Sequence, residues 1–485
     1  MLRIAHQWFK AEATLAFITS TSSSLRPEHQ MHLDRMVGTL CTKLMQATED
    51  VRRVKDVQGT IKKTRYATLW KQTLKEAVTE LERWHTLLEP SLFLIARSAN
   101  PVVDIQLDEN TRMPIENSVN EQLSTIKGLR HAIKAAPDAE GINTFFLETS
   151  DFMAARMKIY YSTALITYNS KTQRNAIVNT IFCDLHSDLT KFQEDVHELA
   201  RVLSQADPLT FGTLACRGIL RPPMTPMDSA PPSEYDVVFD FPGQLGSPRS
   251  LRQVLNEACR RPLVVEGEEV PTYSLGERYH LEKQLARSVM FVHSCSFVYK
   301  QVRPETILLF RDADSTGTLG MPFLVGFERF RAIDGKTFMA GDDFWHRDIY
   351  RAPSRQGRYP EERYSMQNDI YSLGVCLLEI GLWTSFVVRK KTDNMPGPRL
   401  RISKLLEMTE PRRKAATIKQ TLLDLAVRKL PGTLGARYTD VVVSCLTCLD
   451  GNNDTFGEAG EGDEEGIVIG VRYIEVVCKS PRAWN

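Results

Sequence analysis

The sequence predicts an α+β protein in which an all-α helical bundle precedes a domain of mixed strands and helices. Apolar residues recur at steps of three and four in the first part of the chain, which is the period of amphipathic helices. Further on, a proline-rich stretch leads into an alternating strand pattern, and short strands then interrupt a mostly helical sequence. We therefore expect a bundle over residues 1–140, a connecting part with strands over 141–243 and a mainly helical part over 244–485.

The composition is that of a globular protein with more than one domain. The chain has 485 residues, with 61 Lys or Arg against 60 Asp or Glu, so its formal net charge is only +1. This balance creates no overall field toward a polyanion, and we expect no nucleic-acid partner. Nine scattered cysteines do not resemble a disulfide framework, and no apolar run reaches the roughly 18 residues of a membrane-spanning helix. The N-terminal residues also lack the pattern of a signal peptide, so we expect a reducing, cytoplasmic location.

Helical periodicity marks several segments of the N-terminal part. It is clearest over residues 33–54 and again over 70–88. The second of these helices is expected to end before Pro90, because proline disfavours helical backbone at the residue that precedes it. Residues 117–133 and 145–166 show weaker helical patterns. Long amphipathic helices so close in sequence predict an antiparallel bundle.

The connecting part changes from helix to strand across a proline-rich stretch. Residues 192–203 have the apolar spacing of a helix. The prolines and serines of 221–234 predict a loop, since proline fits neither a helix interior nor a central strand. Alternating apolar residues over 236–241 then predict a half-buried strand.

The C-terminal part carries a well-marked helix start. Ser274 and Glu277 have the S-x-x-E spacing of a capping box, which predicts a helix from there to about His293. A strand is expected at 307–310, after a proline that ends any helix. Residues 369–383 are apolar almost all round and therefore predict a helix that is buried on most sides.

Four motifs, in this order, resemble those of protein kinases. YKQVRPETILL at 299–309 is similar to the catalytic loop H-R-D-L-K-P-E-N-I-L-L, and GFE at 326–328 is similar to the metal-binding D-F-G. APS at 352–354 resembles A-P-E, and Asp369 in DIYSLGV stands where the kinase D-x-W-S-x-G motif has its aspartate. The resemblance implies a two-lobed kinase-like fold, with a reduced N-lobe in the connecting part and the C-lobe in the mainly helical part.

The chain is especially similar to kinase-like proteins of filamentous fungi. The similar phrases are LVGFERFR, IYRAPSRQG, MQNDIYSLGVCLLEIGLW and CLTCLD. LERWHTLLEPSLFLI in the N-terminal part resembles the helical part of the same proteins. In some relatives that part is a HeLo-type domain, which acts in fungal non-self recognition and cell death, so the resemblance implies a HeLo-related bundle.

The residues that the chemistry would need are altered. Phosphoryl transfer uses a base, magnesium ligands and a lysine on the phosphates. By the resemblance, the base position holds Gln301, the second magnesium-ligand position holds Thr306 and the principal one holds Gly326. An amide takes up no proton at neutral pH, and glycine has no side chain at all. These positions are therefore degenerate, and we expect neither catalytic residues nor a metal site.

The lysine that binds the phosphates is also missing from its expected strand, around NAIVNTIFCDL. No lysine lies between Lys171 and Lys191. Glu194 and Glu198 on the following helix are either remnants of the ion-pair partner of that lysine or surface glutamates. Glu328 is a carboxylate close to the metal position, but it is displaced by two residues and would point elsewhere.

The residues that hold the kinase scaffold are retained. By the resemblance, Asp369 would fix the backbone of the loop at 299–306, and Tyr299 and Phe327 would stack between the lobes. Arg303 keeps a cation where kinases place a phosphate-contacting lysine. It is either an anion contact or one half of a structural salt bridge, for example with Glu305.

Three further clusters have simpler interpretations than a site. Cys445 and Cys448 form C-x-x-C among valines and leucines, which favours buried thiols. The acidic run 450–461 resembles a calcium loop but lacks its glycine, which favours a solvated loop. The acidic residues and histidine of 342–348 lie in a segment where polar residues collect without binding a metal.

The function that follows from these residues is a pseudokinase that signals through protein partners. One alternative is a divergent, active ATP-dependent kinase that uses Glu328 or Asp342 for the metal. Another is a bundle that acts on membranes under the control of the kinase-like domain. Whether ATP still binds is left open by the sequence.

Overall fold

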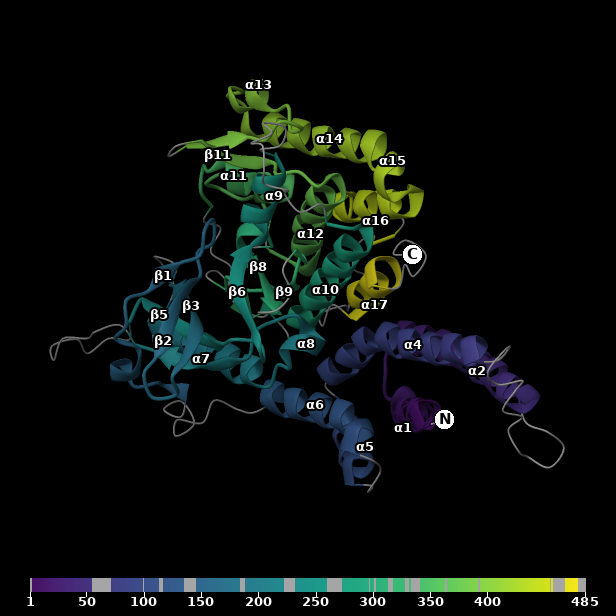
Figure 1. Ribbon diagram of the computed structural model, residues 1–485. Coiled ribbons are helices and arrows are strands. Elements are labelled where there is room, and N and C mark those ends of the chain that lie inside the picture. The colour runs from purple at the N-terminus through teal and green to yellow at the C-terminus, as the bar shows by residue number, and fades with distance from the viewer. Residues whose placement is uncertain are drawn as a thin grey trace. The chain divides into compact units, whose positions relative to one another are not determined.

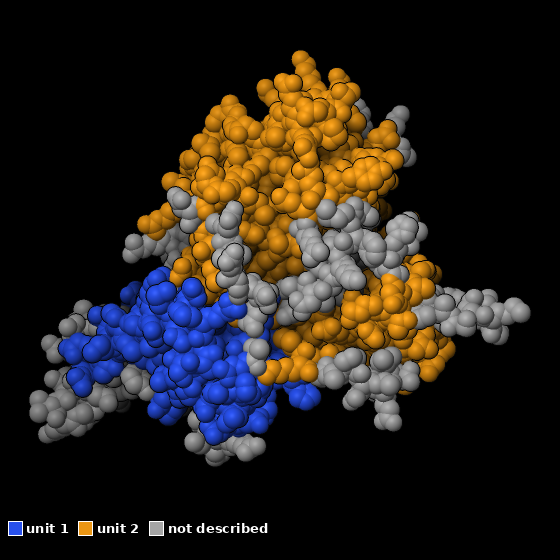
Figure 2. Space-filling view, turned by 180° about the vertical axis from the view of Figure 1, so that it is seen from behind, with its two compact units in different colours: residues 1–131 blue, residues 132–485 orange. Residues whose placement is uncertain are grey.

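The computed structural model is of mixed α+β architecture (Figure 1). It describes residues 2–54, 71–98, 100–112, 117–134, 145–183, 188–221, 232–259, 273–295, 297–300, 302–312, 317–327, 331–332, 341–362, 364–390, 393–453, 455–456 and 467–478. The chain forms two compact units, residues 1–131 and 132–485, which Figure 2 shows in different colours. The expected order of a helical part followed by a mixed part is present.

The first unit is built from helices. They are α1 (Leu2–Ser22), α2 (Pro27–Val54), α4 (Lys71–Arg97), α5 (Val102–Arg112) and α6 (Asn117–Lys134), the last of which continues into the second unit. Helices α2 and α4 pack together, and Leu33, Leu40 and Leu88 on their apolar stripes are at most 1% exposed. The indole N–H of Trp84 donates to the Met36 carbonyl at 3.0 Å across this interface. The periodic segments at 33–54 and 117–133 are thus helices, as expected.

Helix α4 does not end before Pro90, so the expected boundary is wrong. The helix continues through the proline to Arg97. Residues 92–95 are Leu, Phe, Leu and Ile, and all are at most 2% exposed. Burying such side chains stabilises by about 1.5–3 kcal/mol each, which together exceeds the roughly 3 kcal/mol that an internal proline costs. Tertiary burial therefore overrides the local signal.

A buried arginine fixes the end of α4 in the first unit. The guanidinium of Arg130 is bidentate to the carboxylate of Asp104, with Nη2 at 3.0 Å from Oδ2. It also donates to the carbonyl oxygens of Ala96 at 3.1 Å and Asn100 at 2.6 Å. Ala96 lies in the last turn of α4, where carbonyl oxygens have no partner within the helix, and Asn100 follows that helix. One side chain of α6 thereby joins the ends of α4 and α5.

The second unit begins with an antiparallel five-stranded sheet in the order β1-β2-β3-β5-β4. The strands are β1 (Met157–Lys158), β2 (Leu165–Asn169), β3 (Arg174–Phe182), β4 (Cys216–Leu220) and β5 (Glu234–Asp240). The expected strand at 236–241 corresponds to β5. Helix α7 (Leu189–Ser204), which contains the expected helical pattern of 192–203, packs on this sheet and is capped by Asp188.

The helix expected over 145–166 is absent. This stretch contains a 3-10 turn (Thr149–Phe152) followed by β1 and the start of β2. Phe152 lies in an apolar cluster with Ala176 and Val178 of β3, on the other face of the sheet from α7. The chain turns at Tyr161, whose φ of +58° ends any regular helix. Pairing of β2 with β3 decides the structure here. The residues of β3 lie outside 145–166, so the sequence of that stretch alone does not reveal the pairing.

The other strands of the second unit form three small antiparallel sheets. One has the order β6-β8-β9, with β6 (Leu245–Ser250), β8 (Ile307–Asp312) and β9 (Met321–Leu324). The others pair β7 (Phe297–Val298) with β10 (Arg331–Ala332), and β11 (Val387–Lys390) with β12 (Asp393–Pro396). The predicted strand at 307–310 is therefore confirmed as part of β8.

Helix α12 (Met366–Leu382) is the central helix of the second unit, with every residue except Gln367 buried. It contacts α10, α14, α15 and α16. The other helices are α8 (Pro208–Phe211), α9 (Leu251–Cys259), α10 (Leu275–Ser294), α11 (Trp345–Asp348), α13 (Ser403–Leu406), α14 (Pro411–Lys429), α15 (Pro431–Leu434), α16 (Ala436–Leu446) and α17 (Ile467–Tyr473). The predicted burial of this apolar helix is confirmed.

Helix α10 begins with the capping box that its sequence predicts. The amide of Glu277 donates to Ser274 Oγ at 3.2 Å, and the Glu277 carboxylate accepts the Ser274 amide at 2.9 Å. Each contact satisfies an N–H that has no partner within the helix. The start of α10 is thus fixed by local chemistry.

Candidate functional site

Asp369, at the start of α12, holds the loop at 299–306. Its carboxylate accepts the amide of Tyr299 at 2.8 Å and the amide of Lys300 at 2.9 Å. The Tyr364 hydroxyl also donates to it, and Nε2 of the buried His293 lies 3.1 Å away. Lys300 has a φ of +63°, which is unusual for a residue with a side chain. These contacts therefore stabilise a strained loop, in the way that the resemblance predicts.

Thr306 and Gly326, two of the site residues expected from the sequence, lie against each other. Thr306 is fully buried, and its hydroxyl donates to the Arg303 carbonyl at 2.9 Å. Gly326 has a φ of +90°, and a Cβ built there would be 2.5 Å from Thr306 Cγ2 and 3.2 Å from the Tyr299 hydroxyl oxygen. The backbone and its neighbours thus leave no room for a side chain at 326.

A chain of aromatic rings connects this loop to the five-stranded sheet. Tyr299 packs edge-to-face on Phe327 with ring centroids 5.1 Å apart. Phe327 in turn stacks on Phe239 of β5 at 6.1 Å. All three side chains are at most 1% exposed. The rings carry apolar packing from the loop beside Gly326 to the sheet, as the resemblance predicts for Tyr299 and Phe327.

Strand β3 presents an asparagine on the face that carries Phe239. Ile177 pairs with Phe239, so Asn179, two residues further on, lies on the same face of the sheet. Tyr235, on this face too, packs its ring 5.7 Å from Phe192 of α7. Asn179 is 1% exposed, and neither atom of its amide has a partner in the described part of the chain. The neutral amide of Asn179 therefore faces α7 from this strand, and the strand contains no lysine.

Arg303 is buried beside an ionic network that no local sequence pattern marks. Arg252 of α9 is 1% exposed and pairs with Glu305 at 3.0 Å and with Glu379 of α12 at 2.7 Å. It also donates to the Tyr350 hydroxyl. Although burial acts to raise the pKa of Glu305, Arg252 and Arg303 lower it below the usual value. This arrangement supports the structural interpretation of Arg303.

The carboxylates of 342–348 are engaged by arginines. Asp342 lies 2.9 Å from Arg351 and 3.2 Å from Arg347. Burial opposes ionisation, but these guanidinium groups hold the pKa of Asp342 well below its usual range. Asp348 pairs with Arg351 at 2.9 Å. In the described ranges, no group of three or more His, Cys, Asp or Glu side chains has an arrangement that would hold a metal ion.

The remaining candidates are placed as follows. Cys445 and Cys448 are at most 1% exposed, and burial raises the pKa of both thiols, as expected for core cysteines. Glu194 pairs with Lys191 on the surface of α7 at 3.5 Å. Gln301, Glu328 and most of the acidic run after Asn453 lie outside the described residues.

The site is thus a closely packed junction in which the buried polar groups pair with one another. Among its described residues, Arg303 and Arg252 are buried cations, and residue 326 is a glycine that offers no carboxylate. Among the described residues, no helix is long and apolar enough to cross a membrane. No family model matches the chain, and a search of curated proteins finds no match either.

Proposed function

We propose that the second unit is a kinase-like domain without phosphotransfer activity, which works by binding other proteins. The carrying observation is the packing of Gly326 on Thr306, which occupies the space that a metal-binding carboxylate would need. Asn179 in place of a strand lysine supports the same conclusion. The domain retains contacts that stabilise a conformation, and loses those that stabilise a transferring phosphoryl group.

The retained contacts are those of a scaffold. Asp369 fixes the loop backbone, and the rings of Tyr299, Phe327 and Phe239 join the loop to the sheet. Loss of a single base or charge-stabilising group typically slows catalysis by about 10²–10⁴-fold, and here several such positions are altered together.

The test is a phosphotransfer assay on the full chain. We expect no phosphate on the protein or on a generic substrate when the protein is incubated with radiolabelled ATP and either Mg²⁺ or Mn²⁺. Variants Glu328→Ala and Asp342→Asn serve as controls, because an active kinase that uses either carboxylate would lose its signal in one of them. Incorporation that one of these substitutions abolishes would replace the proposal with the active-kinase alternative.

Nucleotide binding is tested separately. A thermal-shift titration with ATP, with and without Mg²⁺, reports any ligand that binds the folded chain in preference to the unfolded one. A magnesium-independent shift that Arg303→Met removes would assign Arg303 to a phosphate contact. The absence of a shift would leave Arg303 with the structural role beside Glu305.

A further inference from the structure

A carboxyl group is buried where three helices of the second unit meet. Glu282 lies on α10 and is 0% exposed. Its Oε1 atom lies 2.5 Å from the hydroxyl oxygen of Tyr438 on α16, and that hydroxyl oxygen lies 2.6 Å from the carbonyl oxygen of Leu377 on α12. Oε2 of Glu282 has no hydrogen-bond partner in the described part of the chain. The side chain of Glu282 is thus connected to the other two helices through the hydroxyl of Tyr438.

Close packing fixes the ring of Tyr438. Tyr438 is 0% exposed, and a Cβ built at Gly381 of α12 would be 2.8 Å from its Cε1 atom. On another side, the ring of Tyr279 packs edge-to-face on it with centroids 6.3 Å apart. Tyr279 is itself tied down, since its hydroxyl donates to the Leu434 carbonyl at 3.2 Å. The hydroxyl of Tyr438 therefore stays between the oxygens of Glu282 and Leu377.

One hydroxyl between two oxygens requires a protonated carboxyl group. A tyrosine hydroxyl has a single proton and donates to one acceptor. If Glu282 were ionised, one of the two short oxygen–oxygen contacts would contain no proton and would be repulsive. A protonated Glu282 supplies the second proton, because its carboxyl group then donates to Tyr438 and Tyr438 donates to Leu377. Burial also raises the pKa of Glu282 well above its usual value, which outweighs the opposing effects of Tyr438 and Arg278.

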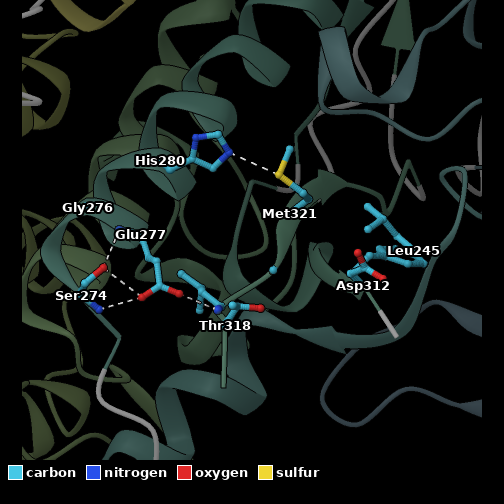
Figure 3. A pocket seen from close by; sticks show the side chains of 11 residues that line it. Leu245, Ser274, Gly276, Glu277, His280, Asp312, Thr318 and Met321 are labelled. Atoms are coloured by element: carbon cyan, nitrogen blue, oxygen red, sulfur yellow. Dashed lines mark hydrogen bonds between the residues drawn. The ribbon is translucent and has the colours of Figure 1, made fainter. Parts of the chain in front are cut away.

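Glu277, earlier on the same helix, has the opposite surroundings. It lies in the wall of the cavity that Figure 3 shows, and its two oxygens accept the amides of Ser274 at 2.9 Å and Leu319 at 3.0 Å. Burial acts to raise its pKa, but these hydrogen bonds lower it overall. N–H donors therefore satisfy the charge of Glu277, whereas Glu282 accepts from no N–H group of the described residues. The two glutamates of α10 thus differ in protonation at neutral pH.

A cation within reach of Glu282 is directed elsewhere. Arg278 lies one turn before Glu282 on α10, and its guanidinium carbon lies 4.5 Å from the centroid of the Trp383 ring. Its Nε atom has no hydrogen-bond partner in the described ranges. Positions i and i+4 of a helix are close enough for an ion pair, so a change of side-chain conformation would bring Arg278 to an ionised Glu282. The titratable groups that act on Glu282 come from two helices and are Arg278 and Tyr279 of α10 and Tyr438 of α16.

We propose that Glu282 makes the packing of α16 on α10 and α12 dependent on pH. In its protonated form, Glu282 connects α10 to the other two helices through Tyr438. When its proton passes to solvent water, the carboxylate pairs with Arg278, which leaves the ring of Trp383, and the bond to Tyr438 is lost. The inference goes beyond the proposed function, because none of these residues belongs to the candidate site and the contacts do not depend on phosphotransfer.

The direction of the pH effect follows from the state that binds the proton more tightly. The pKa of Glu282 is higher in the folded chain, so between about pH 4.5 and the folded pKa the folded chain binds more protons than the unfolded one. The stabilisation is therefore complete below about pH 4.5 and is lost as the pH rises through the folded pKa. Within this range, Glu282 alone raises the ratio of unfolded to folded protein by up to about tenfold per pH unit.

Three substitutions on α10 separate the contributions. Glu282→Gln keeps the size of the side chain and a neutral hydrogen-bonding group, but it cannot ionise. Glu277→Gln is the matched control on the same helix, since the lowered pKa of Glu277 places its titration below about pH 4.5. Arg278→Met removes the cation that favours the ionised form of Glu282 and keeps an apolar side chain against Trp383.

Urea unfolding of the full chain from pH 5 to pH 9, followed by circular dichroism, measures the ratio of unfolded to folded protein. The ratio for the unchanged protein, divided by that for Glu282→Gln, should rise by up to about tenfold per pH unit and level off at the folded pKa. Other titrating groups are common to both proteins and cancel. The curve of Glu277→Gln should run parallel to that of the unchanged protein, and the curve of Arg278→Met should level off at a higher pH.

Hydrogen exchange locates the effect within the chain. Peptides that cover residues 434–446, corrected for the intrinsic effect of pH on exchange, should exchange faster at high pH in the unchanged protein and not in Glu282→Gln. If Glu282→Gln does not fold, Glu282→Leu takes its place, because Tyr438 then keeps the Leu377 carbonyl as its acceptor.

Three results would overturn the proposal. One is a constant ratio between the unchanged protein and the Glu282 variant from pH 5 to pH 9, which would show that folding does not depend on this proton. Another is exchange at 434–446 that does not respond to pH, which would separate Glu282 from the packing of α16. The third is a curve of Arg278→Met that levels off at the same pH as the unchanged protein, which would refute the pairing of Arg278 with ionised Glu282.

Discussion

Gly326→Ala tests the packing on which the proposed function depends. The added Cβ would lie 2.5 Å from Thr306 Cγ2 and 2.9 Å from Thr306 Cβ, in a buried place where neither neighbour is the end of a long side chain. Overpacking of this kind costs about 1–3 kcal/mol. The φ of +90° adds about 1–2 kcal/mol for a residue with a Cβ. We therefore expect the free energy of unfolding to fall by about 2–5 kcal/mol, a large part of the stability of a typical domain.

The two contributions can be separated by a second substitution. Thr306→Ser removes the methyl group that lies closest and keeps the hydroxyl that donates to the Arg303 carbonyl. In the double variant the contact with Cγ2 is removed, while the contact with Thr306 Cβ and the φ strain remain, so we expect a favourable coupling of about 1–2 kcal/mol. Gly432→Ala is the control, since its Cβ meets nothing within 4 Å.

The measurement is urea unfolding of the full chain, followed by circular dichroism. Hydrogen exchange of peptides that cover residues 297–327 locates the loss, because the chain has two compact units. A cost below about 0.5 kcal/mol for Gly326→Ala, or no coupling to Thr306→Ser, would show that residue 326 has room for a side chain. The exclusion of a metal-binding carboxylate would then lose its physical basis.

Three more substitutions have expected outcomes. Asn179→Leu should raise the free energy of unfolding by about 1 kcal/mol or more, because it removes a buried amide without a hydrogen-bond partner. Asn175→Leu is the control, since Asn175 is exposed and its replacement should change the free energy of unfolding little. Equal effects of the two substitutions would refute this reasoning. Pro90→Ala should raise the melting temperature by restoring a hydrogen bond inside α4, and a lower melting temperature would contradict that reasoning. Arg351 lowers the pKa of Asp342 in the folded chain below its value in the unfolded chain. The stabilisation of the fold by ionised Asp342 is therefore complete above about pH 4 and is lost as the pH falls toward the folded pKa. Asp342→Asn should therefore lower stability at pH 7 and flatten its decline in acid, which unfolding curves from pH 7 to 2 would measure.

Several of the long helices, among them α2, α10 and α12, could be predicted from the sequence because their signals are local. The capping box of Ser274 and Glu277 lies within one turn, and the apolar period of α2 and α12 is visible in a single segment. The role of Asp369 followed from a motif and its order in the chain. The presence of threonine at 306 and glycine at 326 could be read in the same way, residue by residue.

The tertiary structure decided what depends on partners far apart in the chain. Strand β2 forms because it pairs with β3, and α4 passes Pro90 because the residues after it are buried. The network of Arg252 joins groups more than 50 residues apart, and no periodicity marks it. The sequence by itself determined which side chains are available for chemistry, since that is a property of each residue. Only the fold decided that Gly326 has no space for a side chain and that Arg252 meets both Glu305 and Glu379, because both are properties of distances between segments.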